Sequence, residues 1–312
     1  MTPSQLRTFS TVVRLGSVRA ASKELGVTEA AVSGSVAALR KQLDDSLFSP
    51  SRAGLVFTPG GLRLAHRAVE MLGLQDQTRR EVHDAHEGRR LLRIAATSLF
   101  AEYAAPGLIA LFSKRADDLE VELLVESSDR FPDLLMSHGV DVAIGPKASS
   151  AQPFGISSEP FLNYEVIAVA APSLSYEGLD ELTWFLGPSA VEPLGVSQFI
   201  LERSGVPEAM QRIHPSHAAA VGEARNGNGI ALVPKFAVST DLAEGALVEI
   251  DQPHCQATGT WAASVLPSHR STQVARELQR FVATPRAIQA MRSGSGTGIG
   301  RFKPKVHITL WS

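Results

Sequence analysis

The amino-acid sequence predicts an α/β protein in three parts: a small helical head that ends in a short hairpin, one long helix, and a two-lobed α/β body. Three observations predict this organisation. The first 60 residues carry closely spaced helix caps and stops, residues 59 to about 87 keep one apolar seam, and short apolar strands alternate with helices from residue 91 onward. With 312 residues, the chain is long enough for two domains with cores of normal size.

Composition and cysteine content limit the classes of protein to which this chain can belong. Hydrophobic residues make up 44% and charged residues 20% of the chain, as in ordinary globular proteins. Cys255 is the only cysteine, so no intramolecular disulfide can form and a reducing compartment is expected. The first residues do not resemble an export signal, and no apolar run is long enough to span a membrane. We therefore expect a cytoplasmic protein without a membrane partner.

The formal net charge of −2 conceals a split along the chain. Residues 1–67 hold 9 Lys or Arg against 4 Asp or Glu, a net +5, whereas residues 68–312 hold 21 against 28, a net −7. A basic head on an acidic body suggests that a polyanion binds the head alone. Chance variation in charge would give the same split, so the sequence pattern has to decide.

Helix caps and stops divide the head into three helices. Thr2 and Gly16 bound the first helix, Ser17 and Gly26 bound a short second one, and Thr28 caps a third. The second and third helices are joined by a very tight turn that contains glycine. This arrangement is the signature of a helix-turn-helix.

A short hairpin follows the third helix. The apolar segments 47–48 and 55–57 flank a stretch of turn residues, Ser-Pro-Ser-Arg-Ala-Gly, which predicts two short strands joined by a turn. Such a hairpin beside a helix-turn-helix is a wing. The sequence therefore predicts a winged helix-turn-helix domain over residues 1–58.

Residues 59–88 predict a single linker or dimerisation helix. Pro59 stands in its first turn, and apolar residues at alternating spacings of three and four form one narrow seam. A long helix with so narrow a seam is more typical of a dimer contact or a linker than of a compact domain. The candidate dimerisation residues are Leu62, Val69 and Leu72.

The body has the pattern of a mainly parallel sheet, because strand, helix and strand alternate with right-handed crossovers. The pattern occurs in two sets and predicts a two-lobed α/β domain over 89–292, with lobe one at 89–164 and 260–292 and lobe two at 165–259. A ligand cleft is expected between the lobes. Residues 293–312 form a glycine-rich linker and a tail, in which alternating Val306, Ile308 and Leu310 predict a strand on a sheet edge or lobe surface.

Residues at fixed spacings through the head carry a resemblance to a known family. They are Leu6, Phe9, Val13, Gly16, Ser17, Ala20, Ala21, Leu25, Thr28, Ala31, Val32, Ser33, Leu39, Leu43, Leu47, Phe48, Thr58 and Gly61. Segments 140–145, 160–161 and 229–234 add to it in the body. With these residues, the sequence resembles the LysR-type transcriptional regulators over about residues 1–290.

This resemblance implies a transcriptional regulator that has no catalytic activity and needs no cofactor. The winged helix-turn-helix would bind double-stranded DNA, and the linker helix would form homodimers, which usually pair into homotetramers in this family. The two lobes, with a fold that resembles the periplasmic binding proteins, would bind a small coinducer as effector. The basic head, the seamed helix and the acidic body agree with these three roles.

Most candidate DNA contacts lie on the exposed face of the third helix, because Val32, Val36 and Leu39 take the buried face. The candidates are Thr28, Glu29, Ala30, Ser33 and Gly34 on that helix and Arg52 in the wing. Glu29-Ala30 replaces a Gln-Pro that is common in the family, and Gly34 replaces a common basic residue. The operator of a relative therefore cannot be transferred. Two explanations account equally well for a glycine at position 34: the backbone approaches DNA closely there, or the substitution is neutral.

Candidate effector contacts lie where strands end and helices begin. Thr97 and Ser98 follow the first strand of the body, where free N–H groups and hydroxyls suit a carboxylate, although Thr97 could be an ordinary N-cap. The resemblance places a coinducer contact at Ser98, and Ser128, Ser197 and His217 are expected on the same rim. We therefore expect a small organic anion between the lobes, with apolar contacts available from Phe100, Leu194 and Phe199.

The sequence also bears on two other classes of protein, a metal-binding protein or enzyme and a solute-binding protein. No metal site is expected, because the histidine pairs and Cys255 form no four-ligand set, and residues 294–300 match neither phosphate-loop pattern of an enzyme. The alternative to a regulator is a cytoplasmic solute-binding or sensor protein without sequence-specific DNA binding. Residues 1–58 count against it.

Overall fold

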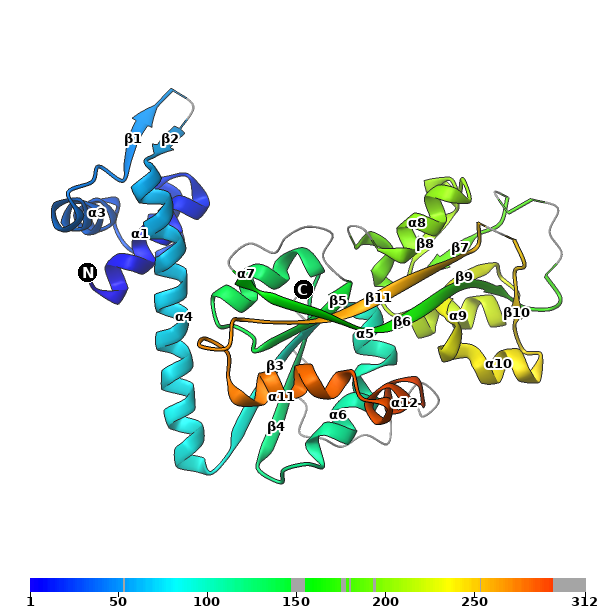
Figure 1. Cartoon of the computed structure of the whole chain (residues 1–312). Coiled ribbons are helices and arrows are strands. Elements are labelled where there is room, and N and C mark those ends of the chain that lie inside the picture. The colour runs from blue at the N-terminus through cyan, green and yellow to red at the C-terminus, as the bar shows by residue number, and fades with distance from the viewer. Residues whose placement is uncertain are drawn as a thin grey trace. The chain divides into compact units, whose positions relative to one another are not determined.

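The computed structural model of the protein describes residues 1–52, 54–146, 155–174, 178–179, 181–192, 195–252 and 254–293 (Figure 1). The chain divides into two compact units. The first holds Met1–Glu87 with Met136–Gly139, and the second holds Gly88–Leu135 with the described residues from Val140 onward. The predicted tail strand at 306–310 and Leu194 lie outside the described residues.

The head has the predicted helices and hairpin. They are α1 (Pro3–Leu15), α2 (Val18–Leu25), α3 (Glu29–Leu43), β1 (Phe48–Ser51) and β2 (Gly54–Phe57), the two strands being antiparallel. The predicted caps are confirmed, because the side chains of Thr2, Ser17 and Thr28 each accept a hydrogen bond from the backbone N–H three residues on. Gly26 has φ +65°, a left-handed conformation that lets the chain turn sharply between α2 and α3.

The core of the first unit joins the three short helices to the long one. Phe9, Val32 and Leu39 are fully buried there, and α4 (Pro59–Glu87) adds Leu64, Ala65 and Ala68 from its first turns. The start of α4 is fixed by Thr58, whose hydroxyl donates to Asp45 Oδ1 at 2.8 Å and accepts from Gly61 N at 2.8 Å. The predicted long helix is thereby anchored to the head at its N-terminal end.

The second unit is built on one nine-stranded mixed sheet in the order β4-β3-β5-β11-β6-β9-β7-β8, with β10 paired to β6. The strands are β3 (Arg90–Ala96), β4 (Leu119–Val125), β5 (Val142–Pro146), β6 (Ser157–Ala170), β7 (Trp184–Leu186), β8 (Gln211–Ile213), β9 (Ile230–Pro234), β10 (Val248–Glu249) and β11 (Gln256–Val265). The helices are α5 (Ser98–Tyr103), α6 (Ala105–Ser113), α7 (Phe131–Met136), α8 (Val196–Arg203), α9 (His217–Arg225), α10 (Ser239–Glu244), α11 (Gln273–Val282) and α12 (Pro285–Ser293).

Two long strands correct the expectation of a mainly parallel sheet. β3 pairs in parallel with β4 and β5, as predicted, but β6 and β11 pair antiparallel with each other and with their other neighbours. Both run through the two lobes and join them (Figure 1). The apolar pattern of a strand does not encode its direction, which depends on the partner it meets.

The helical segment that follows the first strand of the body is divided in two. The chain forms α5 and α6 with a break at Ala104. Pro106 stands in the first turn of α6, where its missing N–H costs nothing, whereas inside a longer helix it would remove a backbone hydrogen bond. The break leaves α5 as a separate short helix at the end of β3.

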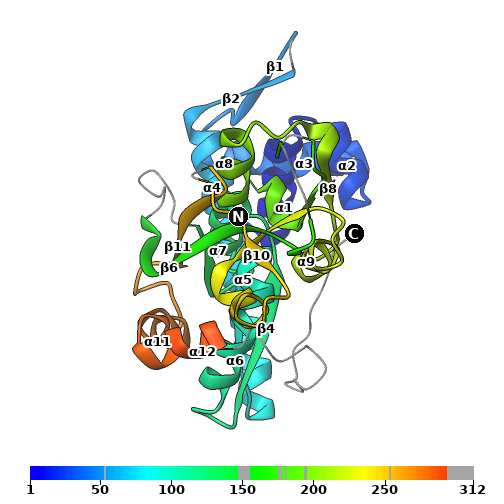
Figure 2. The same cartoon turned by 90° about the vertical axis from the view of Figure 1, so that its right-hand side faces the viewer.

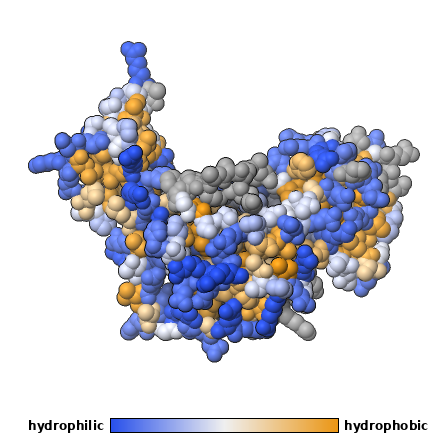
Figure 3. Space-filling view, in the orientation of Figure 1, coloured by the Kyte–Doolittle hydropathy of each residue, from blue (hydrophilic) through white to orange (hydrophobic). Residues whose placement is uncertain are grey.

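Helices cover the sheet in both lobes, with α6, α11 and α12 in lobe one and α8, α9 and α10 in lobe two (Figure 1). Figure 2 shows α8 above and α11 below the long strands β6 and β11. The outward face of α11 is hydrophilic (Figure 3), while Ala275, Leu278 and Val282 are buried beneath it. Short segments between helices and strands, including the turns before α5 and α9, lie where the lobes meet. Among the described helices, none is long and apolar enough to cross a membrane.

Candidate functional site

The outward face of α3 presents the predicted DNA contacts to solvent. Thr28, Glu29, Ala30, Ser33 and Gly34 are all exposed. Val32, Val36 and Leu39 on the same helix are buried in the head. The helix therefore has one face that holds the fold and another that is free to contact a partner.

The wing adds an exposed arginine, and a second arginine is used internally. Arg52 is exposed at the turn between β1 and β2, where the surface is hydrophilic (Figure 3). Arg40 on α3 instead donates from Nε to Ser46 O at 2.6 Å and from Nη2 to Phe48 O at 2.7 Å. Its guanidinium also lies 4.6 Å from the centre of the Phe48 ring. Arg40 thus ties α3 to the wing, while Arg52 remains available.

The predicted dimerisation residues on α4 do not share one environment. Leu62 is 51% and Val69 37% exposed, which leaves both free for an intermolecular contact. Leu72 is half-buried and packs against the core of its own head, so it offers a partner less surface than Leu62 and Val69 do. On α4, Leu72 lies on the side that holds Ala65 and Ala68, which both belong to that core.

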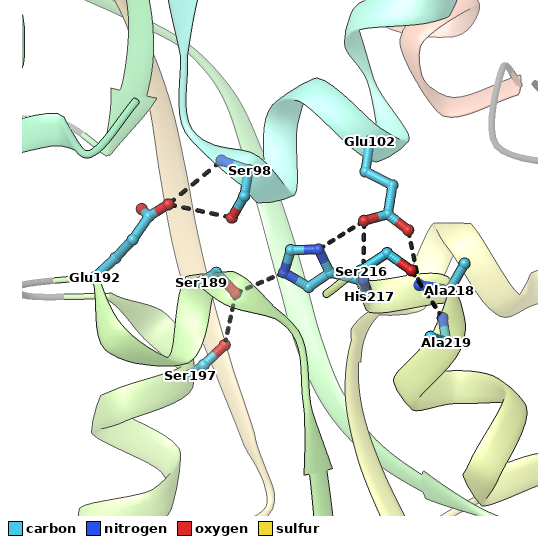
Figure 4. A network of polar contacts seen from close by, with 9 residues as sticks. All are labelled: Ser98, Glu102, Ser189, Glu192, Ser197, Ser216, His217, Ala218 and Ala219. Carbon is cyan, nitrogen blue, oxygen red and sulfur yellow. Dashed lines mark hydrogen bonds and ion pairs between the residues drawn. The ribbon is translucent and has the colours of Figure 1, made fainter. Parts of the chain in front are cut away.

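The predicted anion site at Ser98 is occupied by a carboxylate of the chain itself. Glu192 Oε1 accepts hydrogen bonds from Ser98 N and Ser98 Oγ, both at 3.3 Å. Ser98 begins α5 in lobe one, whereas Glu192 follows a short 3₁₀ helix, Pro188–Val191, in lobe two (Figure 4). The contact therefore joins the lobes.

A second glutamate makes the reverse contact. Glu102, on α5, accepts from His217 N at 2.9 Å and from Ala218 N at 2.7 Å, at the start of α9 in lobe two (Figure 4). Ser216 Oγ accepts from Ala219 N at 3.1 Å, so the first three N–H groups of α9 all have acceptors. A carboxylate from lobe one thus caps a helix of lobe two.

His217 extends this contact into a buried chain of polar side chains. Its Nδ1 lies 2.9 Å from Glu102 Oε2, and its Nε2 lies 2.8 Å from Ser189 Oγ, which is 3.4 Å from Ser197 Oγ. Because a carboxylate only accepts, Nδ1 carries the proton in the first pair. The imidazole packs against Gly187, where a Cβ would lie only 2.2 Å from the ring carbon Cδ2. No other residue fits there without moving the ring.

The carboxylate, imidazole and hydroxyl stand in the order found in hydrolytic triads. However, Ser189 and His217 are 6% and 1% exposed, so a substrate cannot reach the hydroxyl in this arrangement. The chain of hydrogen bonds instead satisfies buried polar groups and holds Pro188–Val191 against α9.

The two glutamates differ in electrostatics. Burial raises the pKa of Glu192 to about 7, against the two hydrogen bonds from Ser98, and the negative charge of Asp129 adds to the rise. Burial also acts to raise the pKa of Glu102, but hydrogen bonds from His217 and Ala218 outweigh it and leave the pKa below the ordinary value. Glu102 is therefore held as a carboxylate, whereas burial makes the charged form of Glu192 less favourable than that of an ordinary glutamate.

Side chains nearly fill the junction between the lobes. The cavity beside Glu192 measures about 10 Å³, roughly the space one water molecule needs. Its lining residues are Thr97, Leu99, Pro146, Tyr164, Ser189, Glu192, Gly195, Val196 and Ser197. A drug-sized ligand needs a few hundred Å³, so side chains have to move before one can bind here.

The predicted effector contacts therefore fall into two groups. Ser98, Ser197 and His217 belong to the polar groups at the junction, and Thr97 lines its cavity with a side chain that is 1% exposed. Ser128 is half-buried at the start of a 3₁₀ helix and makes no hydrogen bond to this group within the described ranges. The charge of its neighbour Asp129 acts on Glu192 at the junction.

The apolar contacts suggested for the effector are corrected. Phe100 is fully buried and packs edge-on against Trp261, with ring centres 5.0 Å apart, so it belongs to the core. Phe199 is 50% exposed and lines, with Arg203, a surface pocket that adjoins the junction cavity through Gly195 and Val196. Tyr164 and Val196, which the sequence did not single out, line the junction instead.

Sequence reasoning missed the acidic residues of the junction, Glu102 and Glu192, together with Ser189. Glu102 had a usable signal, because it stands four residues after Ser98 and therefore on the same face of a helix. Glu192 lies 94 residues from its partner, and nothing in its local sequence indicates the pairing. Within the described ranges, no group of three or more His, Cys, Asp or Glu residues is placed to bind a metal.

Two family models match the chain. The model "Bacterial regulatory helix-turn-helix protein, lysR family" matches residues 3–62, and "LysR substrate binding domain" matches residues 85–285. The HTH-type transcriptional regulator Rv0377 of Mycobacterium tuberculosis is 53% identical over 322 aligned positions, which cover 100% of both chains.

Solved structures share the fold at low sequence identity. DarR of Vibrio fischeri, in complex with DNA, matches with a TM-score of 0.53 and 15% identity over 91% of this chain and 99% of that one. Full-length LysG of Corynebacterium glutamicum, with bound effector Arg, matches with a TM-score of 0.50 and 20% identity over 95% and 98%. The two family models and the 53% identical regulator place the helix-turn-helix head and the two-lobed body in one established class: the chain belongs to the LysR family of DNA-binding transcriptional regulators, which carry an effector-binding domain and are not enzymes.

Proposed function

We propose that the chain binds double-stranded DNA through the exposed face of α3 and the wing. The observation that carries this assignment is the division of α3 into a buried apolar face and an exposed face with Thr28, Glu29, Ser33 and Gly34. Thr28 and Ser33 offer hydroxyls to phosphates or base edges, and Glu29 can accept from a cytosine amino group. Ala30 offers a methyl group, and Arg52 reaches the backbone or the minor groove from the wing.

We also propose that it acts as a homodimer, with Leu62 and Val69 in the seam, and that dimers pair into homotetramers. The exposure of both side chains on a long helix supports this, because covering exposed apolar surface with a partner removes it from water and stabilises the complex. DarR, the neighbour solved with DNA, has the same fold.

The effector is proposed to be a small organic anion that binds at the junction of the lobes. Ser98 binds a carboxylate oxygen in this structure through both its N–H and its hydroxyl, and the acidic group of an effector would use the same donors. Thr97, Ser197 and His217 surround this position, and Ser128 is assigned to its rim. LysG, which has the same fold, was solved with bound effector Arg, a molecule that carries a carboxylate.

Footprinting of the full-length protein on DNA that flanks its own gene tests the DNA-binding role. We expect a protected site that weakens steeply with salt, because cationic side chains displace counterions. Ser33→Ala should weaken binding by about 1–2 kcal/mol if the hydroxyl bonds DNA. Ser35→Ala, on another face of α3, is the matched control and should bind normally. Equal footprints for both variants would remove Ser33 from the interface, and no footprint under any condition would reject the proposal.

A further inference from the structure

The two glutamates that cross the junction hold it with unequal strength. Glu102 uses both oxygens and accepts three hydrogen bonds at 2.7–2.9 Å, the length typical of bonds to a charged acceptor. Glu192 uses one oxygen for two bonds of 3.3 Å, which is long for an N–H or O–H donor. Glu102 is thus a firm connection between the lobes, and Glu192 is a weak one.

The environment of Glu192 favours its release. Its side chain is 8% exposed, so the carboxylate has lost most of its hydration. The groups that face it are Ser98 from α5, Asp129 from the turn before α7 and Tyr164 from β6. Ser98 is the donor among these, whereas Asp129 repels a negative charge at this position. Moving the carboxylate into water would restore its hydration and remove this repulsion.

We propose that the Glu192 carboxylate is a built-in occupant of the acid-binding position at Ser98, and that an acidic effector binds by displacing it. This inference rests on the proposed function, because it takes the effector to be an organic anion. An external carboxylate would replace the carboxylate of Glu192 on the same two donors. The tethered carboxylate of Glu192 then competes with every external anion for the two donors of Ser98. An anion that binds these donors weakly does not displace the tethered group.

Displacement of Glu192 would reach other parts of the junction. Glu192 directly follows the 3₁₀ helix Pro188–Val191, and Ser189 within that helix contacts both His217 and Ser197. A shift of this segment would therefore change the contacts of α8 and α9 while Glu102 keeps its hold on α9. Effector binding would release one of two connections between the lobes and leave the other as a pivot.

The test replaces the tethered carboxylate with a free one. Glu192→Ala removes the atoms of an acetate ion, so acetate is the matched probe. The full-length variant is heated in increasing acetate, at constant ionic strength, with neutral acetamide as the comparison. We expect 100 mM acetate to raise the unfolding midpoint of the variant by about 2–4 °C, and that of the wild type by less than about 1 °C. Acetamide should have little effect on either.

A second variant tests whether Ser98 provides the donors. Ser98→Pro, added to Glu192→Ala, removes both the N–H and the hydroxyl at a helix position that accepts proline. Thr97 already has φ −67° and ψ 154°, which proline tolerates in the residue before it. We expect the acetate effect to disappear in this double variant. An acetate effect of equal size with and without Ser98→Pro, or in the wild type and Glu192→Ala alike, would overturn the proposal.

Glu192→Gln serves if the alanine variant does not fold. The amide has nearly the same size but no charge, so it repels acetate less and competes less well for Ser98. Acetate, followed by saturation-transfer NMR, should bind this variant about tenfold more tightly than the wild type, and equal affinities would overturn the proposal. The outcome is independent of the DNA experiment. A normal footprint with no acetate effect rejects the proposal for Glu192 and leaves the DNA-binding role standing. An acetate effect with no footprint rejects the DNA-binding role and leaves the proposal for Glu192 standing.

Discussion

Glu102 and His217 lie 115 residues apart in the sequence, yet the carboxylate of one accepts from both the backbone N–H and the imidazole of the other. The pair joins α5 of lobe one to α9 of lobe two. Because His217 is 1% exposed, water cannot replace the carboxylate as the partner of its backbone N–H. This contact therefore contributes to the stability of the two-lobed domain as well as to its geometry.

Replacement of Glu102 by glutamine should destabilise the second unit. Oε1 accepts from Ala218 N and Oε2 from His217, so either orientation of the amide points an NH₂ group at an N–H donor. We expect Glu102→Gln to lower the free energy of unfolding by about 1–3 kcal/mol, the cost of an unsatisfied buried group. Urea denaturation followed by circular dichroism measures the change. Glu202→Gln, at an exposed position on α8, should cost less than about 0.5 kcal/mol, and equal losses in both variants would contradict the assignment.

The raised pKa of Glu192 predicts a specific dependence of stability on pH. Its carboxyl has a pKa of about 7 in the folded protein against an ordinary value of 4.5. Between these values the unfolded chain ionises and the folded chain stays protonated, so the free energy of unfolding falls as the pH rises. Above about pH 7 this contribution is constant, and its total is at most about 3 kcal/mol. Well below pH 4.5, where the carboxyl is protonated in both states, the contribution vanishes.

Comparison with Glu192→Gln isolates this contribution, because glutamine does not titrate in this range. The stability of the variant relative to the wild type should increase from pH 5 to pH 7 and then level off. Urea denaturation of both proteins at intervals of half a pH unit gives the difference curve. A difference that stays flat between pH 5 and pH 8 would show that Glu192 ionises with an ordinary pKa.

Charge placed on the proposed seam of α4 should separate the subunits. Val69→Glu would bury an unpaired carboxylate or break the contact, and both are costly. We expect light scattering to give a lower mass for the variant, together with weaker DNA binding. Met71→Glu is the matched control, because Met71 is similarly exposed but lies roughly 200° further round the helix. A Val69→Glu protein that keeps the mass of the wild type would show that another interface holds the oligomer.

The sequence predicts the head more completely than the site in the body. Thr2, Ser17 and Thr28 each cap the helix that follows within a few residues, so a local pattern contains all the information. The position of Ser98 could also be predicted, because the apolar residues of the first body strand end just before it in the sequence. Its partner could not, since Glu192 reaches it only after β6 and β11 have brought the lobes together. Such pairings depend on tertiary structure, whereas hydrophobic periodicity indicates local secondary structure.

The glycine in the middle of α3 gives the last prediction. Gly34 has helical backbone, and a Cβ added there would meet no atom within 4 Å, so Gly34→Ala should stabilise the head by about 0.5–1 kcal/mol through helix propensity. Ala37→Gly, on the same exposed face, should cost about as much, and urea denaturation measures both. Binding to the footprinted DNA then separates the two explanations of Gly34. We expect Gly34→Ala to bind more weakly although it is more stable, because a methyl group would keep the α3 backbone from the groove. Unchanged affinity would mean that Gly34 is a neutral substitution and that the backbone does not approach DNA closely at this position.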